Sequence, residues 1–172
     1  MARQLGLCRV SLVENLGGPR VASRWTATGR GLEVLLATAK REEHDVALEL
    51  LLCVGQALWE KLSPSRRKTY WLLLDEEIGA NTSGEIDEEA LRQKTLLFSG
   101  LDSARSRTRL ERYGAASFAG TAAEYIHALW HDVTVRRGPN FLPAERLRRR
   151  LELLSRWYRP GRGRRLFPGA AE

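Results

Sequence analysis

The sequence lacks any apolar run long enough to cross a membrane. Its longest uncharged apolar stretch extends from Leu50 to Trp59, and Gln56 interrupts it. A membrane-spanning helix needs about 20 such residues. The first residues also lack the pattern of a secretory signal, because Arg9 falls inside the only apolar segment and Glu14 follows it. These absences predict a cytoplasmic protein with no membrane partner.

Cysteine is scarce as well. The chain of 172 residues has two cysteines, Cys8 and Cys53, which are far apart and form no CxxC pair. This count excludes a structural zinc site built from cysteine thiolates. Cys53 lies within an apolar segment, Leu50–Val54, which is typical of a reduced thiol in a hydrophobic core.

The common catalytic signatures are absent. The segment from Gly114 to Gly120 does not match the GxSxG pattern of a nucleophile elbow. The chain has no phosphate-binding P-loop, no three-glycine dinucleotide loop and no HExxH helix. We therefore predict no catalytic residue, no cofactor and a protein that is not an enzyme. The sequence leaves open an enzyme whose site assembles from residues that are distant along the chain.

What the sequence does contain is typical of a folded domain. Hydrophobic residues make up 43% and charged residues 28% of the chain, which argues against a wholly disordered protein. Its length fits one domain, since domains commonly have about 100–200 residues. We predict a single globular domain over residues 1–160, followed by a basic, flexible tail over residues 161–172.

The first 38 residues differ from the rest and predict a small β element. Two β-prone runs, Leu7–Val13 and Val21–Thr28, flank a turn-forming cluster at Asn15–Pro19. This arrangement favours an antiparallel hairpin. Residues 32–38 are compatible with a third strand, which would make a three-stranded meander, or with the start of a helix.

Residues 42–159 are expected to form a helical body. A helix from about 42 to 62 would be apolar around almost its whole circumference, which predicts a central, buried position. The other helices are predicted from capping residues, prolines and glycines at their ends. The predicted fold class is mainly α, with five or six helices around that central helix and the small N-terminal β element (α+β); an all-α bundle is the alternative. The other helices are expected at about 64–79, 85–98, 104–114, 121–133 (starting as early as 118) and 143–159.

Positive charge is concentrated at the C-terminal end. The net charge is +7, yet residues 1–135 hold 17 Lys and Arg against 18 Asp and Glu, a net −1. Residues 136–172 hold 11 Arg against 3 Glu, a net +8. In the helix expected at 143–159, Glu145 and Glu152 are placed to pair with Arg149 and Arg156 at i,i+4 spacing. Seven arginines have no such local partner: Arg146, Arg148, Arg150, Arg159, Arg162, Arg164 and Arg165.

Aromatic residues are interleaved with these arginines, namely Trp157, Tyr158 and Phe167. Arginine with aromatic rings suits phosphate contacts combined with base stacking. We therefore predict a small, non-enzymatic interaction protein that binds nucleic-acid backbone, or is a subunit of a nucleoprotein assembly. An adaptor for an acidic protein partner and an ordinary solvated surface are the alternatives. A second basic stripe, at i, i+4 and i+7, adds three candidate anion-binding residues: Arg105, Arg109 and Arg112.

Basic residues also occupy an unfavourable position at the start of the helix expected at 64–79. Arg66, Arg67 and Lys68 lie in its first turn, where cations oppose the helix dipole. An anionic partner and simple tolerance by solvent are the two explanations that the sequence offers.

A further alternative is a metal-dependent enzyme. Glu124, His127 and His131 form a Glu-x-x-His-x-x-x-His pattern, and histidines four apart face the same way on a helix. The apolar face of that helix lies on its opposite side, which favours a solvated polar face over a divalent metal site. His44 is the only other histidine, and nothing in the sequence places it near the other two.

Overall fold

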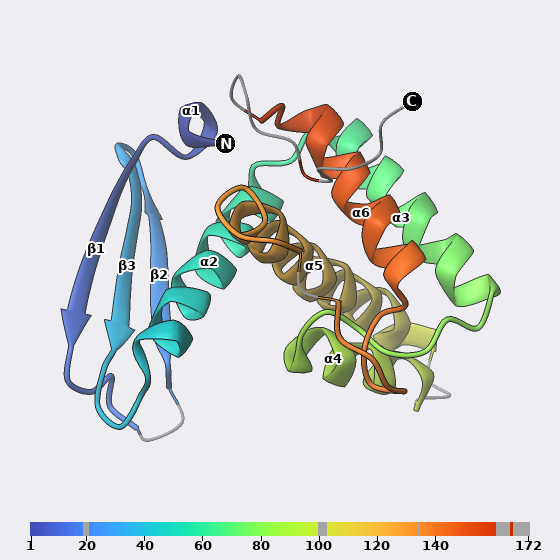
Figure 1. Cartoon of the computed structure of the whole chain (residues 1–172), viewed down its shortest axis with the longest axis horizontal. Coiled ribbons are helices and arrows are strands. Elements are labelled where there is room, and N and C mark those ends of the chain that lie inside the picture. Colours follow the sequence, from blue (N-terminus) through green and yellow to red (C-terminus); the bar gives the residue numbers. More distant parts are fainter. Residues whose placement is uncertain (19–20, 100–102, 134, 161–165, 167–172) are drawn as a thin grey trace.

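The computed structural model describes residues 1–18, 21–99, 103–133, 135–160 and 166. It shows an α+β fold, in which a small N-terminal sheet is followed by a helical body (Figure 1). The predicted basic tail lies outside the described residues, except for Leu166, which is buried. Among the described residues, no helix combines the length and the apolar character needed to span a membrane.

The sheet has three strands in the order β1-β3-β2: β1 (Leu7–Val13), β2 (Ser23–Thr28) and β3 (Gly31–Ala37). The third strand over residues 32–38 is thus confirmed, and the all-α alternative is wrong. The predicted hairpin between the first two strands is also wrong, because β1 pairs with β3 in parallel and only β2 pairs with β3 antiparallel. The tight turn lies at residues 29–30, whereas the longer segment 14–22 carries the chain from one edge of β3 to the other.

The sheet buries one face against the helix that follows it. In β3, Leu32, Val34 and Leu36 are buried, while Glu33 and Leu35 between them are exposed, as the two-residue repeat of a strand requires. Helix α2 (Glu43–Glu60) packs on this face, against β3 and β2. The short helix α1 (Ala2–Leu5) also contacts α2.

Local signals at the helix ends are well placed. Helix α3 (Pro64–Gly79) begins at Ser63, whose hydroxyl accepts a hydrogen bond from the Arg66 N–H at 3.3 Å, with proline as its first residue. Helix α4 (Glu88–Phe98) is capped by Asp87. Helix α6 (Ala144–Trp157) follows Pro143. The capping and proline rules therefore locate α3 and α6 from sequence alone, whereas the expected start of α4 at residue 85 is too early, because Asp87 is the cap.

Helix α5 (Ser103–His127) is one continuous helix. The prediction of two separate helices, 104–114 and 121–133, is therefore wrong, and the predicted end at residue 133 is too late. Gly114 and Gly120 allow close packing and do not break the helix. A Cβ atom at Gly114 would lie 2.3 Å from the Trp71 ring, and one at Gly120 would lie 1.9 Å from Asp87 Oδ2.

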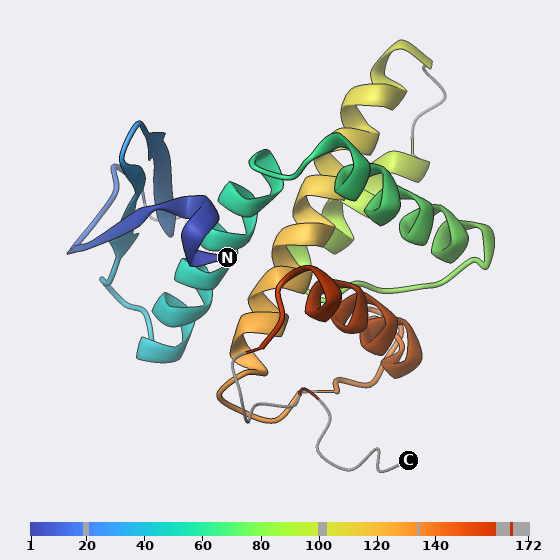
Figure 2. The ribbon, with the colours of Figure 1, turned by 90° about the horizontal axis from the view of Figure 1, so that it is seen from above.

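The helical body is arranged around α5, which contacts α2, α3, α4 and α6 (Figure 2). The predicted central position of the 42–62 helix is not confirmed, because α2 lies between the sheet and α5. The two helices approach closely at Gly55, where a Cβ atom would lie 2.6 Å from the Ala119 carbonyl oxygen. Next to this crossing, Trp59 and Tyr70 pack on Phe118, with ring centroids 5.5 Å and 5.2 Å away.

Candidate functional site

Arg150 is not a surface anion-binding residue. It is 0% exposed, and its Nη1 lies 2.7 Å from Glu85 Oε2 and 2.8 Å from Ser117 Oγ. Its Nε and Nη2 atoms donate to the carboxylate of Glu77. The sequence carried a signal for this position, because Arg150 shares one helix face with the buried Leu147, Leu151 and Leu154.

The partners of Arg150 extend this contact into a buried polar network. Lys94 Nζ lies 3.5 Å from Glu85 Oε1, and the Tyr113 hydroxyl donates to the same oxygen at 2.6 Å. Burial raises the pKa of Glu85, but the charge and hydrogen bonds of Arg150 outweigh it and hold that pKa below its ordinary value. The positive charges of Arg150 and Lys94 thus balance the negative charges of Glu77 and Glu85. The network joins α6 to α3, α4 and α5.

The surface of α6 pairs its charges differently from the predicted pattern. Arg148 Nε lies 2.9 Å from Glu152 Oε1, and Arg149 Nη2 pairs with Glu76 on α3. Within the part of the chain that the structure describes, no ion pair involves Arg146, Arg156 or Arg159. Arg146 and Arg159 thus lack an ion pair, as predicted, whereas the predicted pair of Arg156 with Glu152 is not formed in the described residues, because Glu152 pairs with Arg148.

Contacts with aromatic rings account for two of the three basic residues in the first turn of α3. The Arg66 guanidinium lies 5.6 Å from the Trp157 ring centroid and 5.5 Å from that of Tyr158. Arg67 donates from Nη2 to the Trp59 carbonyl oxygen at 2.9 Å and lies 4.9 Å from the Trp59 ring. Arg67 therefore satisfies a carbonyl at the end of α2, while Arg66 joins the start of α3 to the end of α6. The sequence offered neither reason.

These contacts gather positive charge at one place. The Met1 α-amino group lies close enough to Arg66 that burial and this neighbouring charge lower its pKa. Figure 1 shows the N-terminus, the start of α3 and the end of α6 toward the same end of the molecule. Within residues 1–18, 21–99, 103–133, 135–160 and 166, no ion pair involves the basic side chains at this end of the molecule. We call this end of the molecule the cationic end; it comprises the start of α3, with Arg66 and Lys68, and the end of α6 with the residues just after it, with Arg156 and Arg159.

The other predicted basic residues lie elsewhere or are not described. Arg109 is half-buried and Arg112 is exposed near the start of α5, beside α4 and far along the helix from its contact with α2 (Figure 2). The side chain of Arg105 is outside the described residues. The same holds for Arg162, Arg164 and Arg165, which follow Pro160 in the sequence.

The structure brings all three histidines together, which the sequence could not show. The His44 and His127 rings lie 6.5 Å apart at an edge-to-face angle, and the His127 and His131 rings are stacked at 4.9 Å. His131 lies beyond the end of α5. In the described residues, no group of three or more His, Cys, Asp or Glu side chains converges to hold a metal ion. The structure thus places His127 and His131 side by side, with no convergent ligand set around them in the described residues.

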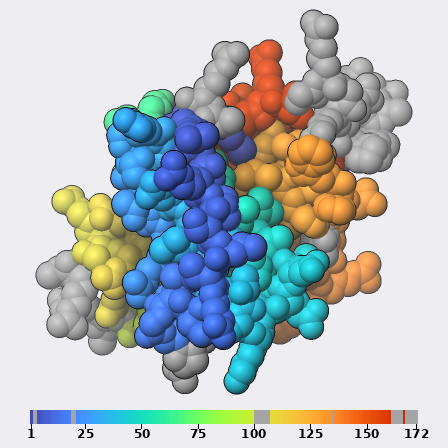
Figure 3. Space-filling view, turned by 90° about the vertical axis from the view of Figure 1, so that its left-hand side faces the viewer, coloured from blue at the N-terminus to red at the C-terminus, as the bar shows by residue number. Residues whose placement is uncertain are grey.

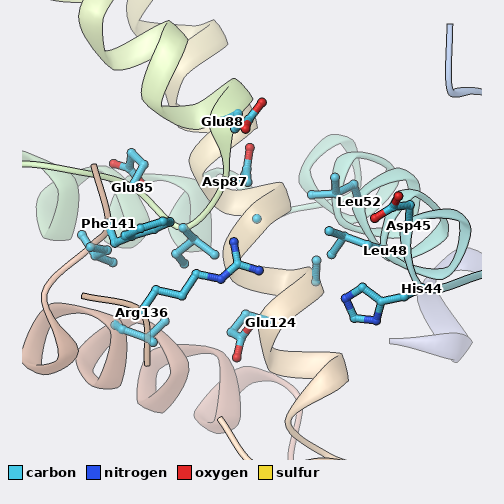
Figure 4. Close-up of a pocket in the computed structure, with 15 residues that line it drawn as sticks. His44, Asp45, Leu48, Leu52, Glu85, Asp87, Glu88, Glu124, Arg136 and Phe141 are labelled. Atoms are coloured by element: carbon cyan, nitrogen blue, oxygen red, sulfur yellow. The ribbon is translucent and has the colours of Figure 1, made fainter. Parts of the chain in front are cut away.

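Beside the histidines lies a pocket of about 290 Å³ that sequence analysis missed. Its polar lining comes from α2, the start of α4, α5 and the segment before α6, so no local pattern could reveal it. Figure 4 shows Arg136 extending across it, with Asp87, Glu124 and His44 around it. The Arg136 guanidinium lies 5.7 Å from the Phe141 ring centroid.

Asp87 has a perturbed pKa in this pocket. Its Oδ1 accepts the Ala90 N–H at 3.0 Å, whereas its Oδ2 is buried without a hydrogen-bond partner, next to Gly120. Burial is the main reason that the pKa of Asp87 is raised to about 6.

Asp87→Asn should change how stability depends on pH. Because the pKa of Asp87 is higher in the folded than in the unfolded state, ionisation of Asp87 costs stability as the pH rises through 4 to 6. Asparagine keeps the helix cap but does not ionise. We expect the wild type to gain on the order of 2–3 kcal/mol relative to this variant between pH 7 and pH 4. Urea unfolding of both proteins across this range measures the difference; a constant difference would contradict the assignment.

Comparisons of the chain with protein-family models, with curated proteins and with solved structures give no match.

Proposed function

We propose that this protein is a non-enzymatic binding protein for nucleic-acid backbone, acting in the cytoplasm through its cationic end. The observation that supports the proposal best is the stacking of Arg66 on Trp157 and Tyr158. This contact joins basic residues from two segments that are distant in sequence. It also sets them beside the point from which the arginine-rich residues after Pro160 continue.

The mechanism is electrostatic. Unpaired cations at the cationic end replace the counterions that are condensed on phosphates, and the released counterions favour binding. Trp157 is half-buried and leaves part of its ring available for contact with an unpaired base. Such a surface reads backbone charge and has little means to read sequence. We therefore expect similar affinities for oligonucleotides of different sequence.

The burial of Arg150 decides which variants can test this function. A change at Arg150 would disturb the core, so it would confuse loss of folding with loss of binding. Arg156 and Arg159 are exposed, so charge reversal there leaves the core intact. Arg109 and Arg112 on α5 provide a matched control, because the same two charges are reversed at the second predicted basic stripe.

Arg156→Glu with Arg159→Glu should weaken binding to a labelled oligonucleotide by at least about tenfold at low salt, because phosphate contacts are lost and repulsion is added. Arg109→Glu with Arg112→Glu should change it by less than about threefold if the cationic end is the site. Fluorescence anisotropy with single- and double-stranded oligonucleotides measures both. Equal loss in the two variants, or loss in the control alone, would overturn the assignment.

An acidic protein partner could use the same surface. The two partners are distinguished by nuclease treatment of material that co-purifies with the full chain. A complex that disappears after nuclease treatment supports the proposal, and a protein complex that survives it with no oligonucleotide binding favours the adaptor.

A further inference from the structure

Strand β1 is an open edge of the sheet. Its Leu7 N–H donates to the Arg30 carbonyl at 3.2 Å, and its Val13 carbonyl accepts the Thr38 N–H at 2.9 Å. Backbone groups of successive residues in a strand point to alternate sides. Every second residue between these two therefore turns its N–H and C=O groups away from β3, toward the open edge. These residues are Cys8, Val10 and Leu12.

The side chains of the same residues form an uncovered apolar row. They stand opposite Leu32, Val34 and Leu36 of β3, so they lie on the sheet face that α2 covers. Helix α2 packs against β3 and β2, and the row on β1 is left exposed: Val10 is 41% and Leu12 is 65% exposed. Figure 3 shows β1, in dark blue, uncovered on this side of the molecule.

The opposite edge of the sheet, β2, is protected. Trp25 Nε1 donates to Gln56 Oε1 of α2 at 2.6 Å, and Ser23 Oγ donates to Glu49 Oε2 at 3.0 Å. The exposed residues of its other face are polar or charged: Arg24, Thr26 and Thr28. Polar and charged side chains protect edge strands from pairing. On the face that α2 covers, β2 has such side chains bound to the helix, whereas the β1 row consists of Cys8, Val10 and Leu12.

We propose that β1 is a homodimer interface, in which β1 of one copy pairs antiparallel with β1 of a second copy. The pairing is centred on Val10 and makes one six-stranded sheet. It is independent of the cationic end, which lies on α3 and α6.

The register follows from the residues themselves. In an antiparallel pair, two opposite residues that exchange hydrogen bonds must both turn their N–H and C=O groups toward the other strand. When Val10 lies opposite Val10 of the second copy, Cys8, Val10 and Leu12 all meet this requirement. Cys8 then lies opposite Leu12 of the second copy, and Arg9 lies opposite Ser11. A register shifted by two residues in one direction would put Arg9 opposite Arg9 of the second copy, where like charges repel. The opposite shift would put Cys8 opposite Glu14, which lies beyond the end of the strand.

The symmetry also covers the apolar row. The twofold axis of such a pair is perpendicular to the sheet, so both copies of α2 lie on the same face. Cys8, Val10 and Leu12 of the two copies then form one apolar strip between the two helices. A second copy of this chain thus satisfies the open backbone groups and the exposed side chains together.

Val10→Lys is the first test, because it places two lysines opposite each other at the centre of the pair. The wild type should sediment as a dimer at micromolar concentration, and Val10→Lys should raise the dissociation constant at least about tenfold. Ala27→Lys is the matched control: Ala27 is exposed at the β2 edge, and this variant should remain a dimer. A monomeric wild type, or a Val10→Lys variant that dimerises like the wild type, would overturn the proposal.

Cross-linking tests the register without disturbing the sheet. Leu12→Cys puts a new thiol opposite Cys8 of the second copy, at a Cα separation that a disulfide can bridge. Mild oxidation should convert this variant to a covalent dimer. Val13→Cys places the thiol on the other face of the strand and should stay largely monomeric on a denaturing gel. Equal cross-linking of the two variants would contradict the register.

Discussion

Replacing Arg150 by alanine is expected to lower the free energy of unfolding by about 3–5 kcal/mol. The side chain is fully buried and donates to Glu77, Glu85 and Ser117. Its removal leaves two buried carboxylates with Lys94 as the nearest cation. An uncompensated buried charge costs far more than the original pair contributes, so the loss exceeds that of an ordinary cavity.

Arg148→Ala is the control for this prediction. Arg148 lies on the same helix and forms a surface pair with Glu152, and such pairs contribute about 1 kcal/mol or less. Chemical denaturation of both variants measures the contrast. Lowering the pH should recover part of the Arg150→Ala loss, because protonation neutralises the uncompensated carboxylates. Equal, small losses in both variants would show that Arg150 is not in the core.

The crossing of α2 and α5 predicts a second large effect. Gly55→Val should destabilise the protein by about 3 kcal/mol, because overpacking a close contact forces the helices apart. Even the Cβ atom would lie 2.6 Å from the Ala119 carbonyl oxygen, a backbone atom that cannot rotate away.

Gly79 is the matched control for Gly55. It ends α3, and a Cβ atom added there would meet no heavy atom within 4 Å, so the same substitution enters open space. Valine and glycine differ by only a few tenths of a kcal/mol in helix propensity, so Gly79→Val should stay close to the wild type. Thermal or urea unfolding compares the two variants. A Gly55→Val protein as stable as Gly79→Val would contradict the close approach.

Short-range signals were sufficient for part of the fold. Ser63 with Pro64, Asp87 and Pro143 each mark a helix start because capping depends on a few neighbouring residues. The apolar residues of β3 were compatible with a strand or with the start of a helix, and its pairing could not be inferred from them. Parallel pairing of β1 with β3 is a long-range contact, and no local turn encodes it.

The remaining errors of the sequence-based prediction come from residues that can play two structural roles. Gly114 ends a helix in one context and receives a tryptophan ring in another, and only the packing partner distinguishes these roles. Arg150 was assigned by its charge although its position on the apolar face of α6 indicated burial. The pocket and the meeting of His44 with His127 join four separate segments, so their formation depends on tertiary structure alone.

The salt dependence of oligonucleotide binding tests the proposed function most directly. The cationic end has four basic side chains that form no ion pair within the described part of the chain. Each phosphate contact contributes about 0.7–0.9 to the slope of log K against log salt concentration. We predict a slope of about −3 or steeper for the full chain, with a shallower slope for the variant carrying Arg156→Glu and Arg159→Glu. An affinity that does not change with salt, or no binding at low salt, would contradict the proposal.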